Sequence, residues 1–139
     1  MKTYALRLHP HEDLKQALEV FRQEQDLQAG LVLTCVGSLR RAALRMADQP
    51  DTTMLEGKFE IVSLVGTLSP DGPHLHISIS DGTGQTVGGH LQTGALIYTT
   101  AEIVLGELED VTFRREVDPE TGYDELSARP RRPERSAEA

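Results

Sequence analysis

The sequence predicts an α+β fold, a two-layer sandwich with a mainly antiparallel sheet and one main N-terminal helix. Three observations predict it. Helical spacing of apolar residues is clear in only one stretch, close to the N-terminus. Most other apolar residues alternate with polar ones or form short continuous runs, as in strands. Clusters of Gly, Pro and Asp separate these runs and indicate turns. One helix with many strands fits a domain of two packed layers.

The helix is expected shortly after Pro10, which suits a helix start. Four apolar residues fall at i, i+3, i+4 and i+7 and form one stripe: Leu14, Ala17, Leu18 and Phe21. Glu12 and Asp13 are expected in the first turn, where the helix dipole favours acidic side chains.

The remaining elements are expected to be strands. The run LVLTCVGSL is continuously apolar, so we expect a strand buried on both faces that ends at Gly37 and Ser38. SPDGP and DGTGQ are turn signals, because Pro presets φ and Gly tolerates positive φ. Strands are expected at residues 4–8, 31–39, 40–46, 57–69, 74–80, 86–91, 101–109 and 111–118.

The 139 residues are enough for one domain, which we place at residues 1–125. Residues 126–139 are dominated by Pro, Arg, Glu and Ala, so we expect a disordered Arg/Pro-rich tail. Cys35 is the only cysteine, which excludes an intrachain disulfide and fits an inert core residue.

The net charge of −8 argues against general nucleic-acid binding by the folded body, because such binding needs clustered Lys and Arg. No stretch approaches the roughly 20 apolar residues of a membrane helix. No secretory leader opens the sequence, so we expect a cytoplasmic protein without membrane contact.

Histidines form the most chemically specific pattern. His74 and His76 are two residues apart on an expected strand, so their side chains share a face, while Leu75 points to the other. The DGTGQ turn should return the chain as a hairpin that brings His90 beside this strand. An HxH pair alone is common by chance, so the prediction depends mainly on the third histidine, His90.

The hydrophobic pattern selects the hairpin register. If Ser80 pairs with Thr86, apolar residues face apolar ones and His76 lies opposite His90, with Cβ atoms about 5 Å apart. A slip of one residue would place His90 opposite Leu75 and mix the faces. Three converging imidazoles suit Zn, and also Ni, Cu or Fe. The fourth position is open to water, to a substrate or to a partner's side chain.

Other signals favour plain structural readings. His9 and His11 form a second HxH without a third partner and are expected at the surface. Asp71 and Asp81 are expected to serve turns rather than to act as a general base. Glu60 is expected to face solvent or to form a salt bridge across a subunit interface. The segment ARPRRPER resembles an AT-hook that lacks its central Gly, so a solvated tail is the simpler interpretation.

The string FEIVSLVGTLSPDGPHLHISISDGTGQTVGGHL resembles the signature of the PPC domain, the plants-and-prokaryotes-conserved domain. GLVLTCVGSLRRAALR fits the strand of that family that ends in a Gly-Ser pair, and the resemblance covers residues 4–116. It implies an α+β sandwich and a homotrimer. Plant versions follow AT-hooks and lack the histidines, whereas stand-alone prokaryotic versions carry HLH and GGH and bind zinc in some members. The resemblance therefore implies a metal site at His74, His76 and His90.

The sequence leaves three functions to weigh. The first is a trimeric zinc-binding regulatory or interaction module, with DNA or a protein as its partner. The second is a zinc-dependent enzyme acting on a small molecule, with the three histidines holding a metal-bound water. The third is a DNA-binding regulator that acts through the arginine-rich tail, which the acidic body disfavours. The first needs no further parts, so we expect a binding module rather than an enzyme.

Overall fold

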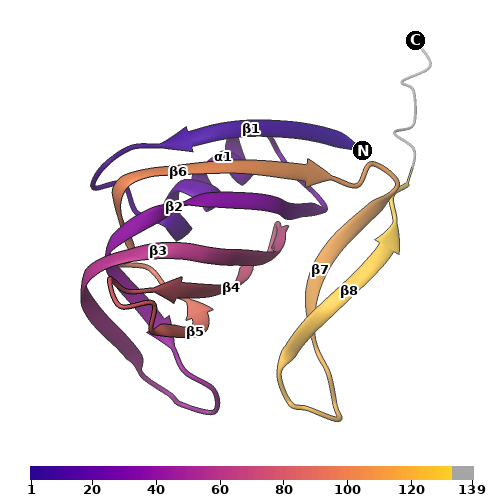
Figure 1. Ribbon diagram of the computed structural model, residues 1–139. Helices are drawn as coiled ribbons and strands as arrows, with labels where there is room; N and C mark the ends of the chain where they lie inside the picture. Colours follow the sequence, from indigo (N-terminus) through magenta and orange to yellow (C-terminus); the bar gives the residue numbers. More distant parts are fainter. Residues whose placement is uncertain (133–139) are drawn as a thin grey trace.

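The computed structural model describes residues 1–132 and shows a mainly β chain with one helix (Figure 1). The elements are β1 (Lys2–Leu8), α1 (Leu14–Glu24), β2 (Gly30–Arg45), β3 (Thr52–Ser69), β4 (Gly72–Ser80), β5 (Thr86–Leu91), β6 (Leu96–Glu107), β7 (Val111–Val117) and β8 (Asp124–Pro130). The mainly antiparallel sheet and the single main helix are confirmed, while the two-layer sandwich stays a prediction. No helix within residues 1–132 has both the length and the apolar character to span a membrane.

Six strands form one antiparallel sheet in the order β1-β6-β2-β3-β4-β5. The end of β2 also pairs with β5, with Leu44 opposite Leu91 and Arg45 opposite His90. Strands β2, β3, β4 and β5 therefore close into a ring. The closure brings the end of the long strand β2 beside the histidine hairpin, although 45 and 90 are far apart in the sequence.

Helix α1 confirms the predicted apolar stripe. Leu14 and Leu18 are fully buried in the core, and Phe21 packs against it at the edge. Asp13 is the N-cap rather than a first-turn residue, because its Oδ1 accepts a hydrogen bond from the Gln16 N–H at 3.0 Å. Such a cap stabilises a helix by about 1 kcal/mol. The other carboxylate oxygen accepts from the Gly94 N–H at 2.7 Å, so Asp13 also anchors the helix to the β5–β6 connection.

Strand β2 corrects one prediction. Gly37 and Ser38 do not end a strand, because β2 runs without a break through both positions. At Gly37 an added Cβ would overlap the carbonyl oxygen of Thr100, so glycine permits the close approach of β6. The Ser38 hydroxyl hydrogen-bonds that of Thr99 at 2.9 Å across the same strand pair. Two residues that resemble a break are therefore strand-packing residues.

The C-terminal segment corrects a second prediction. Residues 126–130 are not a disordered tail but part of β8, which pairs with β7 from Val111 opposite Pro130 to Val117 opposite Asp124. This β7–β8 hairpin, which we call the arm, projects from the sheet as a separate ribbon (Figure 1). Backbone pairing and ion pairs hold β8, so its low apolar content did not reveal it. Residues 133–139 of the predicted tail lie outside the described residues.

The arm is attached to the body at its base and along β7. At its base, Arg131 contacts the buried carboxylate of Glu107 at 3.0 Å and donates to the Val111 carbonyl. Further along, Asp71 in the β3–β4 turn accepts from the Arg115 backbone N–H at 2.9 Å and pairs with the Arg114 guanidinium at 3.0 Å. Asp71 is therefore a turn residue that also fixes the arm beside β4.

The β3–β4 ladder supplies a stability test at Gly66. This residue has φ +145°, and an added Cβ would overlap the backbone carbonyl of His74. Gly66→Ala should lower the free energy of unfolding by at least about 2 kcal/mol, since overpacking and a strained φ each cost about 1–3 kcal/mol. Chemical denaturation measures the change. Gly82→Ala, with nothing within 4 Å of the added Cβ, should change it by less than about 0.5 kcal/mol. Equal losses for the two variants would contradict this account.

Candidate metal centre

The β4–β5 hairpin has the register predicted from the hydrophobic pattern. Ser80 lies opposite Thr86 and His76 lies opposite His90. Leu75, Ile77 and Ile79 are buried on the core side of β4. The alternation of the strand then leaves the histidines on the opposite face. Burial of the core side thus holds the three imidazoles on the outer face.

Asp81 stabilises the turn that closes this hairpin. Its Oδ1 accepts from the Thr83 N–H at 2.8 Å, from the Thr83 hydroxyl at 2.6 Å and from the Gln85 N–H at 3.1 Å. The Thr83 hydroxyl is the largest cause that lowers the pKa of Asp81, followed by the backbone donors. Asp81 is therefore a turn residue, as predicted, and not a base.

The three rings lie together. Their centroids are 4.4 Å apart for His76 and His90, 5.1 Å for His74 and His76, and 5.5 Å for His74 and His90. One ring nitrogen from each histidine lies within 4.8 Å of the other two. His76 is exposed, while His74 and His90 are half-buried. The cluster is the one group of three or more metal-ligating side chains within residues 1–132.

The donor set fits a metal ion. Zinc binds imidazole nitrogen at about 2.0–2.1 Å, so three tetrahedral ligands have their nitrogens about 3.4 Å apart. The observed ring nitrogens lie within 4.8 Å of one another, so the imidazoles must move closer together to bind one ion. At Gly88 an added Cβ would lie 2.7 Å from the Ile77 carbonyl oxygen, so glycine at this position permits the close approach of β4 and β5. Three neutral nitrogens leave one coordination position free.

The electrostatic surroundings keep two of the rings neutral. Burial is the main cause that lowers the pKa of His74, with the Arg115 charge second. Burial also lowers the pKa of His90, and the Arg45 charge is the next cause. Neutral imidazole is the form that binds a metal ion. The two rings are therefore ready to bind without losing a proton at neutral pH.

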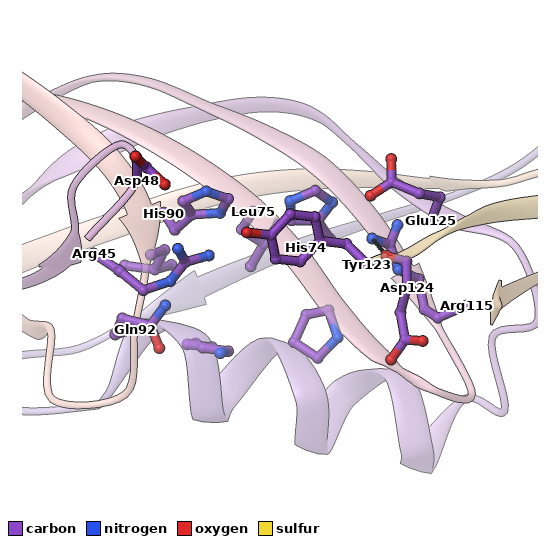
Figure 2. A pocket seen from close by; sticks show the side chains of 13 residues that line it. Arg45, Asp48, His74, Leu75, His90, Gln92, Arg115, Tyr123, Asp124 and Glu125 are labelled. Carbon is purple, nitrogen blue, oxygen red and sulfur yellow. Dashed lines mark hydrogen bonds between the residues drawn. The ribbon is translucent and has the colours of Figure 1, made fainter. Parts of the chain in front are cut away.

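A cleft opens beside the cluster. It has a volume of about 510 Å³ and lies between the histidine hairpin, the end of β2, helix α1 and the arm. A second, smaller hollow of about 240 Å³ also touches His74 and Arg115, and borders His76 and Val65. In the view of Figure 2, Arg45 and Asp48 lie on the His90 side of the cleft, and Arg115, Asp124 and Glu125 lie on the His74 side. The histidine cluster thus lies at the wall of a ligand-sized space.

The sequence did not reveal the residues around the histidines. Arg45 reaches the site because β2 pairs with β5, and Arg115 reaches it because Asp71 fixes the arm. Neither long-range contact leaves a signal in local spacing. Tyr123, Asp124 and Glu125 also line the cleft from the arm, a segment that lies partly in the predicted tail.

The structure agrees with the plain readings of the other singled-out residues. His9 pairs with Glu12 and His11 with Arg40 at the surface. Glu60 is exposed. Cys35 is buried, and burial raises the pKa of its thiol to about 11, so it stays protonated.

Comparison with protein families assigns the chain to one family. Residues 1–109 match the model of the Plants and Prokaryotes Conserved (PCC) domain. The chain therefore belongs to this family, which confirms the resemblance seen in the sequence. The arm lies beyond the matched residues.

Three relatives illustrate the similarity. The Bifunctional protein GlmU of Synechococcus sp. (strain JA-2-3B'a(2-13)) is 54% identical over 130 residues, which are 94% of this chain and 21% of that protein. The matched part of this chain thus spans about a fifth of the length of this protein and of the GlmU protein of a second Synechococcus strain. A hypothetical protein from Salmonella enterica is 45% identical, with a TM-score of 0.92 over 94% of both chains. A metal-containing protein from Archaeoglobus fulgidus is 28% identical, with a TM-score of 0.72 over 91% of this chain and 94% of its own.

The lowered pKa values predict how metal binding responds to pH. Protons compete with the ion for imidazole nitrogen, and the ordinary histidine pKa is about 6.5. Because His74 and His90 have lower values, protonation of these two ligands should weaken zinc binding only below about pH 6.5. Competition with a chromophoric chelator between about pH 5 and pH 8 measures this. A fall that begins well above pH 6.5 would contradict the assigned neutral state.

Proposed function

We propose that the chain is a zinc-binding PCC-domain module that acts in regulation or interaction as a homotrimer. His74, His76 and His90 are its metal ligands. The observation that carries the proposal is the convergence of three imidazole nitrogens from two paired strands, all within 4.8 Å. The lowered pKa values of His74 and His90 cost stability at acidic pH, and a bound ion would offset that cost.

The donor chemistry supports zinc as the ion. Imidazole suits Zn, Cu, Ni and Fe, and a set of three imidazoles with an open position is typical of zinc sites. The Archaeoglobus fulgidus relative is described as metal-containing, and 28% identity over 91% of this chain supports a shared site. The ion itself would be held at the wall of the cleft rather than in the core.

An exposed apolar surface supports self-association. Leu33 and Val36 on β2, and Val62 and Val65 on β3, are 43%, 61%, 59% and 55% exposed, and we call them the apolar outer face. The β2–β3 register, with Leu31 opposite Thr67 and Gly37 opposite Ile61, puts Leu33 across from Val65. Large apolar side chains in one contiguous patch mark an interface. We expect the protein to be cytoplasmic, and the subunit contacts of a homotrimer would cover this face.

DNA association would depend on the C-terminal arginines, because the net charge is −8. Arg129 contacts Glu116, and Arg131 contacts Glu107. These ion pairs reduce the charge available to phosphate groups. A protein partner therefore fits the described residues better than DNA does.

A zinc-dependent enzyme that acts on a small molecule is the second candidate. The cleft of about 510 Å³ favours it, because ligand sites commonly measure about 300–1,000 Å³. A metal-bound water would be the nucleophile and a nearby carboxylate its base. The carboxylates of Asp48, Asp124 and Glu125 line the cleft but are not part of the histidine cluster, and a base must reach the water within about 2.6–3.2 Å. The binding module therefore remains the better-supported function.

Removal of one ligand tests the metal site. Removing a residue that only hydrogen-bonds a metal ligand typically weakens metal binding about 10–100-fold. His76→Ala removes a ligand itself, so it should weaken zinc binding by more than this. Elemental analysis after dialysis measures the zinc retained per chain. His11→Ala is the matched control, because His11 is exposed and pairs with Arg40, and it should retain full zinc. Full zinc in His76→Ala would overturn the ligand assignment.

A charge on the apolar outer face tests the trimer. Val62→Glu should convert a particle of about three chain masses into a monomer, because burying an unpaired carboxylate costs several kcal/mol. Light scattering coupled to size-exclusion chromatography measures the mass. Val20→Glu, on the exposed side of α1, should leave the mass unchanged. A monomeric parent protein would remove the interface proposal.

A further inference from the structure

We propose that the cleft beside the three histidines binds a small dicarboxylate, with one carboxylate on the metal and the other paired with an arginine. The inference rests on the proposed zinc site and deepens it. It assigns the ligand of the open coordination position and gives roles to Arg45 and Arg115, which the metal site alone does not use.

Two arginines of the described residues line the cleft without forming a salt bridge. Within residues 1–132, neither Arg45 nor Arg115 has a carboxylate within ion-pair distance. Arg45 makes one long contact, 3.5 Å, to the Gln49 carbonyl, and Arg115 donates to the Asp124 carbonyl. A guanidinium group can bind a carboxylate through two parallel hydrogen bonds. Both side chains therefore keep donors available for an anion.

The fold holds these arginines beside the metal position. Arg45 lies opposite His90 in the β2–β5 ladder. The backbone of Arg115 is fixed by Asp71 at 2.9 Å, and its charge helps to lower the pKa of His74. Figure 2 shows the two arginines on either side of the histidines. A ligand bound to the ion between them can therefore reach a guanidinium group with its free end.

The charge of the cleft favours an anion with two negative charges. Its lining includes three cationic and three carboxylate side chains: Lys15, Arg45, Arg115, Asp48, Asp124 and Glu125. The cations are half-buried, whereas the carboxylates are exposed at the rim, where water and salt screen them. Formal charges cancel, so a divalent ion on three neutral imidazoles leaves an excess of two positive charges. A dianion neutralises this excess.

A dicarboxylate fits the open coordination position and the guanidinium group together, whereas a single carboxylate can occupy only one of them. Carboxylate oxygen is an accepted zinc ligand at about 2.0–2.2 Å, and the second carboxylate suits the guanidinium fork. The volume of about 510 Å³ leaves room for a short carbon chain between the two groups. Leu75 and Leu91 provide apolar surface in the lining for that chain.

Calorimetric titration of the zinc-loaded protein tests the proposal, with succinate, acetate and inorganic phosphate as probes. Succinate should bind, and acetate should bind at least about 10-fold more weakly, since a charged hydrogen bond contributes about 1.5–3 kcal/mol. At least one of the variants Arg45→Gln and Arg115→Gln should weaken succinate binding about 10-fold or more, because the free carboxylate pairs with one of these two arginines. Arg40→Gln, an exposed arginine that contacts His11, is the matched control and should bind succinate normally.

Elemental analysis of each sample separates the two levels of the proposal. If zinc is retained but succinate does not bind, or binds equally to the arginine variants, the dicarboxylate site is overturned and the metal site stands. Tighter binding of phosphate than of succinate likewise overturns the dicarboxylate assignment. If the parent protein takes up no zinc, the proposed metal function itself has failed. In the cobalt-substituted protein, succinate should change the visible absorption of the ion, and an unchanged spectrum would contradict direct coordination.

Discussion

The pairing register of the β4–β5 hairpin is the constraint on which the site depends. Ser80 opposite Thr86 places His76 opposite His90, and burial of Leu75, Ile77 and Ile79 fixes which face each strand presents. A slip by one residue would move every side chain of the strand to the other face. It would bury imidazoles and expose branched apolar residues. The burial of apolar side chains that stabilises the core thus also positions the three nitrogen donors.

Two long-range features complete the surroundings of the cluster. The ring closure between β2 and β5 brings Arg45 to His90, and the Asp71 contact brings the arm, with Arg115, to His74. Together they convert three surface histidines into one wall of a charged cleft. The arm lies outside the residues matched by the PCC family model, so the three histidines lie within the matched residues while part of the cleft lining does not.

The sequence predicted those parts of the molecule that local patterns determine. The helical stripe of Leu14 and Leu18 and the alternation of residues 74–80 each report a buried face directly. The continuity of β2 was missed, because Gly37 serves a close strand approach that cannot be distinguished from a break. Strand β8 was missed because backbone pairing and the Arg131–Glu107 ion pair, not apolar burial, hold it. Arg45 and Arg115 were missed because only tertiary contacts bring them to the histidines.

X-ray absorption at the zinc edge of the zinc-loaded protein tests the central claim most directly, since it reports the atoms bound to the ion. The account predicts three imidazole nitrogens at about 2.0–2.1 Å and one further light atom. A sulfur neighbour at about 2.3 Å, or a shell of oxygen atoms without imidazole, would show that the ion lies elsewhere. Either result would contradict a metal centre at His74, His76 and His90.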